Sequence, residues 1–247
     1  MQARFVVTPI LSKIQALYAL PRNSARFKEY LQQLQGDTKD DMVLPIAGFN
    51  PMAKEVAIHK IEELQALRAE DILREVAESL NQSIPRSVHR KFQIVLNLGD
   101  DVQGAWTNRY ATDYTSKFKL NPMVKRGFCV PYFYTSESFS EEGIRRRAFA
   151  YAYRTWYWLE HGPQRTLKEL LQQEVYVARS LGALREAPTI TDFSEIADFY
   201  QTAMDEDDYS VLFNFFYGDE ASEALGYTTF DLPAEAGFAY ADYLANQ

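Results

Sequence analysis

Apolar positions in this chain recur mostly three and four residues apart, which is the period of an amphipathic helix. Proline favours the first turn of a helix and glycine follows its end, so these residues divide the pattern into segments. The predicted helices cover residues 9–20, 24–35, 51–69, 70–80, 141–160, 166–181 and 192–204. In the second of these, Ser24 is the expected N-cap, and Phe27, Leu31 and Leu34 form the expected buried stripe.

The period changes to two at residues 92–98, where apolar residues alternate with others as in a half-buried β-strand. A second strand is expected at residues 127–135. Pro131 favours an edge position for it, because proline donates no hydrogen bond to a ladder. The chain is therefore expected to be α+β and mainly α-helical, with a small sheet of two or three strands in one globular domain, residues 1–247.

Charge is distributed unevenly along the chain. The last basic residue is Arg185, and residues 186–247 hold 14 acidic residues and no Lys, Arg or His. Since the whole chain has 34 acidic and 26 basic residues, residues 1–185 carry a net charge of +6. This pattern suggests a subdivision into a mildly basic body (1–185) and an acidic segment (186–247).

The acidic segment is also rich in Phe and Tyr, which a solvated disordered tail lacks, so it is expected to fold. Its ordinary interpretation is an acidic surface packed on the body. Two alternatives are a docking face for a basic protein partner and a folded mimic of nucleic acid.

Several classes of protein are disfavoured by the sequence. The single cysteine, Cys129, permits no disulfide within the chain and no cysteine-based zinc site. The first 20 residues are interpreted as an amphipathic helix rather than a signal peptide, and no apolar run is long enough to span a membrane. A cytoplasmic protein is therefore expected.

No nucleotide-binding, hydrolase or zinc-protease motif is present, and no cofactor is indicated. The best cluster of metal-ligand residue types is Glu55, His59, Glu62 and Glu63. Helical spacing places these side chains opposite the apolar stripe of their own helix, where charged residues face water. No metal site is therefore predicted.

The helix predicted at 141–160 carries a candidate ligand-binding face. Arg147, Tyr151, Arg154 and Trp158 follow one another at intervals of four, three and four residues. Two guanidinium groups beside two aromatic rings suit a phosphate, a carboxylate or a nucleobase. The structural alternative is that the rings pack, while the arginines pair with the acidic segment.

Glu174 is a candidate catalytic residue, because it lies on the apolar stripe of the helix predicted at 166–181. A carboxylate in such a place is either paired or held neutral, and a neutral one can act as an acid or base. The structural alternative is a buried salt bridge to an arginine of the 141–160 helix.

The loop expected after the first strand offers a third candidate site, since loops on rigid elements often carry function. Its ligand-binding candidates are Asp100, Asp101, Trp106 and Arg109. The structural alternative is that one aspartate caps a turn and Trp106 covers the edge of the core.

These observations favour a non-catalytic binding protein that engages a protein partner or an anionic small ligand. The surfaces proposed for this are the acidic aromatic segment and the Arg/Tyr/Trp face. The first alternative is a metal-independent enzyme acting on an anionic small molecule, with Glu174 as acid or base. A nucleic-acid binder or mimic is the second alternative, and the acidic segment argues against nucleic-acid binding.

Overall fold

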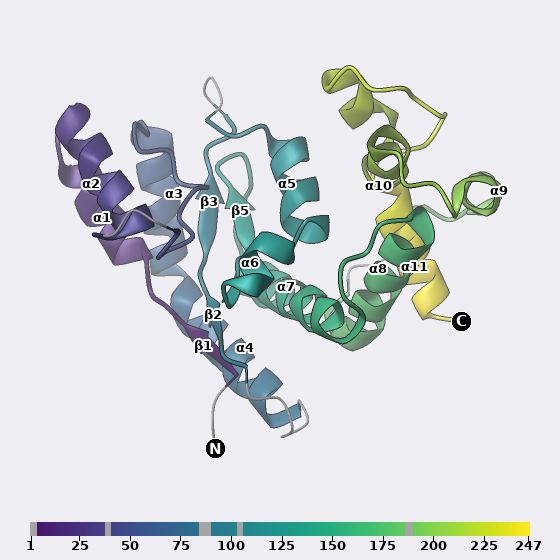
Figure 1. Cartoon of the computed structure of the whole chain (residues 1–247), viewed down its shortest axis with the longest axis horizontal. Helices are drawn as coiled ribbons and strands as arrows, with labels where there is room; N and C mark the ends of the chain where they lie inside the picture. The colour runs from purple at the N-terminus through teal and green to yellow at the C-terminus, as the bar shows by residue number, and fades with distance from the viewer. Residues whose placement is uncertain (1–3, 38–40, 84–89, 103–105, 186–189) are drawn as a thin grey trace. The chain divides into compact units, whose positions relative to one another are not determined.

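The computed structural model describes residues 4–37, 41–83, 90–102, 106–185 and 190–247 of the chain. It divides into two compact units, one of residues 1–116 and 121–151, the other of residues 117–120 and 152–247. All strands found in the described residues belong to the first unit (Figure 1). The fold is α+β and mainly α-helical, with a small sheet, as the hydrophobic pattern predicts.

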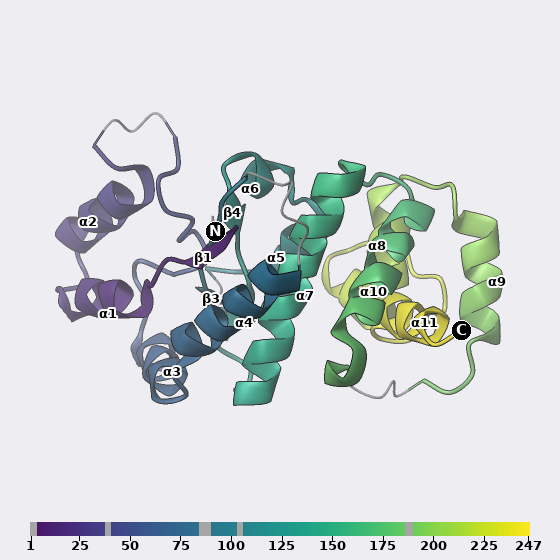
Figure 2. The same ribbon diagram turned by 90° about the horizontal axis from the view of Figure 1, so that it is seen from below.

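The first unit combines short parallel strands with helices. Its elements in chain order are β1 (Phe5–Val7), α1 (Leu11–Ala19), α2 (Ser24–Gln35), α3 (Glu55–Ala66), α4 (Ala69–Ser83), β2 (Phe92–Ile94), β3 (Asn97–Gly99), α5 (Arg109–Phe118), α6 (Asn121–Lys125), β4 (Phe128–Cys129), β5 (Tyr132–Tyr134) and the first part of α7 (Glu141–His161). Helix α4 packs against β1, and α1 packs against both α2 and α3 (Figure 2).

Each of the two predicted strands is split in two. Residues 92–98 give β2 and β3, and residues 127–135 give β4 and β5. The strands pair in parallel in the orders β1-β2-β4 and β3-β5. Hydrogen bonds bridge the split, because the Val95 amide donates to the Cys129 carbonyl (3.0 Å) and the Asn97 amide to the Pro131 carbonyl (2.9 Å). Pro131 has no N–H with which to continue the ladder, which accounts for the break.

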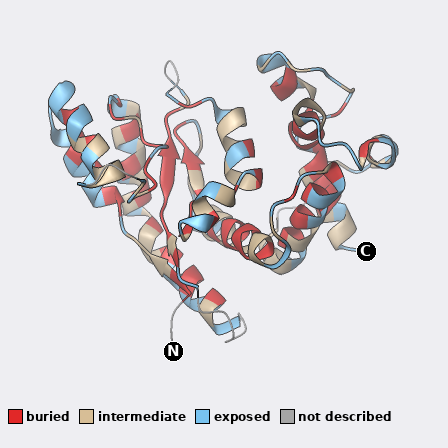
Figure 3. Cartoon of the chain, in the orientation of Figure 1, coloured by how far each residue is buried: buried red, intermediate tan, exposed pale blue. Residues whose placement is uncertain are grey.

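The expected half-burial of residues 92–98 is wrong. Every residue from Phe92 to Gly99 is buried except Gln93, which is half-buried (Figure 3). Parallel strands are usually covered on both faces, and such strands do not alternate between core and solvent. The edge position expected for residues 127–135 is confirmed for β4, which pairs only with β2 among the described strands.

Asn97, fully buried at the start of β3, fixes the segment that leads into α3. Its Nδ2 donates to the Pro45 carbonyl (2.5 Å) and its Oδ1 accepts from the Gly48 amide (2.9 Å). A Cβ at Gly48 would lie 2.8 Å from that Oδ1, so this approach requires glycine. Two residues after Gly48, Asn50 Nδ2 donates to Asp100 Oδ2 (2.7 Å). The segment is thus tied to the end of β3.

Three elements of the first unit were not predicted. Strand β1 lies in the stretch interpreted as an amphipathic helix, and its three residues are too few to show a period. Helices α5 and α6 lie between the predicted strands, where polar and aromatic residues are mixed. Only Tyr114 and Phe118 of α5 and Val124 of α6 are buried, so neither helix has a long apolar stripe.

The second unit is helical. It comprises the last part of α7, then α8 (Leu167–Leu181), the 3₁₀ helix η1 (Gly182–Leu184), α9 (Ser194–Ala203), α10 (Tyr209–Ala224) and α11 (Ala236–Ala245). The predicted capping box at the start of α8 is confirmed: Thr166 Oγ1 accepts from the Glu169 amide, and the Glu169 carboxylate accepts from the Thr166 amide. Helix α10 is kinked at Gly218, whose φ is 79°.

The described part of the acidic segment is helical. Residues 190–247 form α9, α10 and α11, and α11 packs against α8, α9 and α10. Residues 186–189 lie outside the described part of the chain. The change of charge at Arg185 falls within the second unit, which begins in α7.

Candidate anion-binding pocket

Arg147, in the first unit, pairs with a carboxylate of the same unit. Its Nη1 and Nη2 donate to the two carboxylate oxygens of Glu137 at 2.6 and 3.1 Å, and Nη1 also donates to the Tyr132 carbonyl (3.0 Å). Burial alone would lower the pKa of this guanidinium, but the hydrogen bonds and charge of Glu137 raise it above the usual value. Arg147 is therefore held as a cation in an internal ion pair.

Arg154 and Glu174 form a buried salt bridge in the second unit. Arg154 Nε and Nη2 donate to Glu174 Oε1 (2.8 Å) and Oε2 (2.5 Å), and both residues are at most 5% exposed. Gln173 Nε2 also donates to Glu174 Oε1 (3.0 Å). This confirms the structural alternative for Glu174, a salt bridge to an arginine of α7.

The expectation that Arg147 and Arg154 pair with the acidic segment is wrong. Glu137 and Glu174 both precede the acidic segment, so the basic body supplies its own carboxylates. Tyr151 is buried and its hydroxyl hydrogen-bonds Ser116 Oγ at 2.7 Å. Trp158 is half-buried. The packing expected for Tyr151 is thus observed.

The third candidate site links the loop after β3 to the loop after β5 through hydrogen bonds. Asp101 accepts from Thr135 Oγ1 (2.8 Å) and from the amide and hydroxyl of Ser136 (2.9 and 2.6 Å). Arg109 donates to Ser136 Oγ (2.7 Å) and to Glu137 (2.9 Å), the carboxylate that also holds Arg147. The structure therefore brings Arg109 and Arg147 together on the Glu137 carboxylate, and the Asp101 carboxylate lies 3.9 Å from Arg109.

Asp100 and Trp106 lie apart from that carboxylate cluster. Asp100 is buried and accepts from Asn50, as described above. The Trp106 ring is 48% exposed, and its Nε1 donates to the Ala47 carbonyl at 3.2 Å. Both side chains therefore contact the segment that leads into α3; residues 103–105 of this loop lie outside the described part of the chain.

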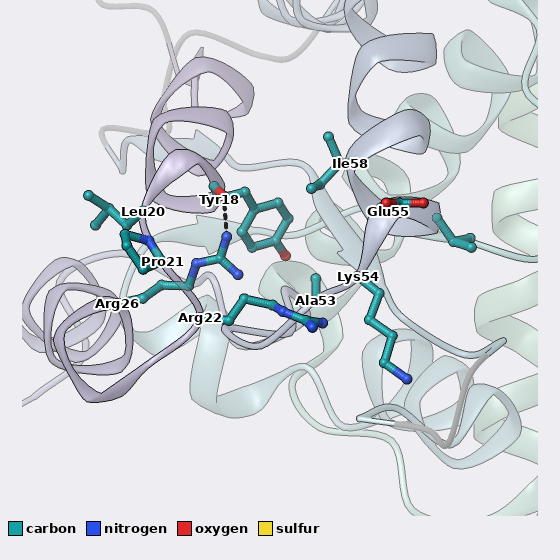
Figure 4. Close-up of a pocket in the computed structure, with 10 residues that line it drawn as sticks. Tyr18, Leu20, Pro21, Arg22, Arg26, Ala53, Lys54, Glu55 and Ile58 are labelled. Carbon is teal, nitrogen blue, oxygen red and sulfur yellow. Dashed lines mark hydrogen bonds between the residues drawn. The ribbon is translucent and has the colours of Figure 1, made fainter.

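A pocket of about 550 Å³ lies in the first unit, where the end of α1, the turn into α2 and the start of α3 meet (Figure 4). None of the residues singled out as ligand-binding candidates lines it. The lining residues are Tyr18, Leu20, Pro21, Arg22, Arg26, Ala53, Lys54, Glu55, Val56 and Ile58.

The backbone at the pocket follows from local sequence signals. Helix α1 ends at Ala19, and Pro21 keeps it from continuing. Helix α2 is capped by Asn23, not by Ser24 as expected, since Asn23 Oδ1 accepts from the Ala25 amide (2.9 Å) and the Arg26 amide (3.4 Å). Helix α3 has no side-chain cap, because its N-cap position holds Lys54. The Ala57 amide donates to the Lys54 carbonyl (3.2 Å), so the amides of Glu55 and Val56 are the ones left for an anion.

Arg26 is the most unusual residue of the pocket. It is 2% exposed, its Nη2 donates to the Tyr18 carbonyl, and its guanidinium lies 5.3 Å from the centre of the Tyr18 ring. Its Nε and Nη1 are buried without a hydrogen-bond partner among the described residues. Burial lowers the pKa of Arg26; Tyr18 opposes this shift, and repulsion from Arg22 adds to it.

Two further cations stand at the rim. The side chains of Arg22 and Lys54 are exposed, and neither forms an ion pair within the described part of the chain. Glu55 is the one acidic residue in the lining. Burial and the charge of Asp100 raise the pKa of Tyr18 far above its usual value, so its hydroxyl stays neutral and can donate a hydrogen bond.

No direct signal for this pocket is visible in the sequence. Helix α2 buries Arg26 and Tyr30, four residues apart, whereas the expected stripe of Phe27, Leu31 and Leu34 is half-buried or exposed. The buried face of α2 is therefore displaced by one residue from the face that the apolar pattern predicts. The sequence does contain one indication of the buried face, an arginine four residues before a tyrosine. An analysis of apolar positions does not count arginine and therefore misses it.

A second hollow of about 450 Å³ lies in the second unit, among α8, α9 and α11. It is mostly apolar, with Tyr176 and Tyr200 in its lining. The one arginine in it, Arg179, donates to the Leu244 carbonyl at 3.3 Å. This hollow therefore has no converging charges comparable to those of the first.

Other kinds of site receive no support. Within the described residues, no group of three or more His, Cys, Asp and Glu side chains is placed to hold a metal ion. Of the helices described, none combines the length and apolar character that crossing a membrane requires. Comparison with protein-family models, with curated proteins and with solved structures finds no match for this chain.

Proposed function

We propose that this protein is a non-catalytic binding protein that holds an anionic small ligand in the pocket formed by α1, α2 and α3. The observation that carries the proposal is Arg26, a buried guanidinium with two nitrogen atoms that lack hydrogen-bond partners among the described residues. Such a group destabilises the folded chain unless an anion compensates it. Arg22, Lys54 and the uncapped start of α3 add positive potential at the same place.

The first prediction concerns Arg26→Met. In the unmodified protein, an anion such as inorganic phosphate should raise the free energy of unfolding, by about 1.4 kcal/mol at ten times its Kd. Arg26→Met should abolish this increase. It should also leave the ligand-free protein as stable as before, or more stable by about 1–3 kcal/mol, because an uncompensated buried charge is removed. Urea denaturation with and without phosphate measures both quantities.

Lys28→Met is the matched control, because Lys28 is an exposed cation on the same helix and lies outside the pocket. It removes the same unit of charge and should preserve the phosphate effect. Equal stabilisation of the Arg26→Met and unmodified proteins by phosphate would contradict the proposal.

The enzyme hypothesis gains no support from the geometry. Glu174 lies in the second unit, is fully engaged by Arg154 and Gln173, and lines neither of the two hollows. We therefore do not propose a catalytic role for it.

The acidic segment is kept as a second proposed binding surface, for a basic protein partner. The supporting observation is that Asp205, Glu206, Asp207 and Asp208 are consecutive and exposed. Its aromatic rings largely pack on one another, as Phe213 and Tyr217 do at 4.9 Å, so the carboxylates would make the contact. Mimicry of nucleic acid by these carboxylates, and nucleic-acid binding by the basic body, remain predictions. We place the protein in the cytoplasm because its single cysteine suits a reducing compartment.

A further inference from the structure

We infer that the ligand of this pocket is an organic phosphate monoester, with its phosphate among the cations and an apolar body against the apolar side chains of the lining. This inference rests on the proposed function, because it specifies the chemistry of the anion. The supporting features are the charge of the lining, the direction of its donors, the size of the pocket and its apolar wall.

The charge of the lining matches a dianion. Arg22, Arg26 and Lys54 supply three positive charges and Glu55 one negative charge, which leaves a net of two positive charges. A phosphate monoester carries a charge of about −1.5 to −2 at neutral pH, whereas a carboxylate carries −1. A carboxylate ligand would leave part of this charge uncompensated.

The donors of the lining come from more than one segment of the chain, so a tetrahedral phosphate could accept from them on different sides. Arg22 lies in the turn before α2 and Arg26 in its first turn, whereas Lys54 and the first amides of α3 come from another segment (Figure 4). The Tyr18 hydroxyl has no hydrogen-bond partner among the described residues and is a further neutral donor. Three outward oxygens can accept from such a set, while the two oxygens of a planar carboxylate cannot reach all of it.

The pocket is larger than a bare phosphate and has an apolar side. Its volume of about 550 Å³ lies within the range of sites for small organic molecules, about 300–1,000 Å³. Leu20, Pro21, Val56 and Ile58 supply the apolar lining, and the Leu20 side chain is 40% exposed. A bare phosphate would leave this wall in water, whereas an organic substituent would cover it.

Glu55 restricts the class of ligand further. Its exposed carboxylate stands beside Lys54 in the lining, where it would repel a second anionic group of a longer polyphosphate. A single phosphate avoids this repulsion, so the lining favours a monoester over a di- or triphosphate.

The test is titration calorimetry of the full chain with phenyl phosphate, inorganic phosphate and benzoate. Phenyl phosphate should bind at least about tenfold more tightly than inorganic phosphate, because its ring buries apolar surface against Leu20 and Ile58. It should also bind more tightly than benzoate, since benzoate carries half the charge and fewer acceptor oxygens.

Two variants locate the parts of the ligand. Arg22→Gln should weaken phenyl phosphate and inorganic phosphate by a similar factor, because it removes a charge next to the phosphate. Leu20→Ser should weaken the binding of phenyl phosphate alone and bring its affinity close to that of inorganic phosphate. Circular dichroism of each variant establishes that the fold is retained.

The outcomes separate the two levels of the proposal. Equal affinity for phenyl phosphate and inorganic phosphate would overturn the apolar body and leave anion binding in place. Benzoate binding as tightly as phenyl phosphate would overturn the assignment of a phosphate. Binding of none of the three anions would overturn the proposed function itself.

Discussion

Arg26 and Arg154 are both buried arginines, but their surroundings differ. Arg154 Nε and Nη2 donate to both carboxylate oxygens of Glu174, whereas Arg26 Nε and Nη1 have no hydrogen-bond partner in the described part of the chain. A buried charge with a matched partner is neutral or mildly costly to the fold, and a buried charge without one is strongly destabilising. At the scale of single residues we therefore interpret Arg154 as structural and Arg26 as a binding group.

A double-mutant comparison tests the structural interpretation of Arg154. Glu174→Leu leaves the buried Arg154 guanidinium without its carboxylate partner and should lower the free energy of unfolding by about 3–5 kcal/mol. The double variant Glu174→Leu with Arg154→Met should recover most of this loss, because no buried charge remains. Urea denaturation of both variants is the measurement. A double variant no more stable than Glu174→Leu would contradict the interpretation.

The apolar pattern could predict the salt bridge but not the pocket. Glu174 stands out because it interrupts a stripe of leucine and valine, and only a paired carboxylate is stable there. Arg26 occupies the position that defines the buried face of α2, so the pattern shifts to its neighbour Phe27, which is 37% exposed. Arg22 and Lys54 belong to no periodic pattern of apolar residues, and only the fold places them in the lining of one pocket.

Capping interactions at helix starts are local, so at the scale of elements some of them are predictable from the sequence. The capping box of Thr166 and Glu169 lies within four residues of chain, so its signal is complete in the sequence. Strand boundaries depend instead on partners far away: β2 pairs with β1 across 87 residues, as Phe5 with Phe92. The two predicted strands were therefore located correctly but divided incorrectly, and β1 was not predicted.

The prediction at the scale of elements concerns Gly218. Helix α10 is kinked there, and a Cβ on residue 218 would lie 2.5 Å from the Pro233 carbonyl oxygen. With a φ of 79°, Gly218→Ala combines backbone strain with this clash and should lower the free energy of unfolding by roughly 1–3 kcal/mol.

Gly226→Ala is the matched control for that prediction. It too has a positive φ, 72°, but its Cβ would meet no atom within 4 Å. Its smaller loss would isolate the backbone contribution. Equal thermal shifts for the two variants would mean that the approach of Pro233 contributes nothing.

At the scale of the whole molecule, charge and fold divide the chain at different places. The sequence changes from basic to acidic after Arg185, whereas the second compact unit takes in residues 152–247. Helix α8 carries the basic residues Lys168 and Arg179 and packs against α11 of the acidic segment. Composition shows the charge boundary, but only the packing of helices defines the units.

Removal of the acidic segment tests this description. Helix α8 buries Leu170, Leu171 and Val177, and it loses the helix packed against it when the chain ends at Arg185. The truncated chain should therefore aggregate or bind a hydrophobic dye, unlike the full chain. Size-exclusion chromatography and dye fluorescence measure this. A monomeric truncated chain that binds heparin, when the full chain does not, would instead identify the segment as a detachable mask.

The anchoring of residues 45–50 to the sheet has a consequence for the speed and selectivity of binding. Asn97 and Asp100 fix this segment, and Tyr30 of α2 reaches its Ile46 carbonyl at 3.4 Å, so the backbone leading to Lys54 is already in place before a ligand arrives. Conformational entropy is then lost mainly by the side chains of Arg22 and Lys54. Association should consequently proceed in a single kinetic step, with discrimination between ligands expressed in their residence times.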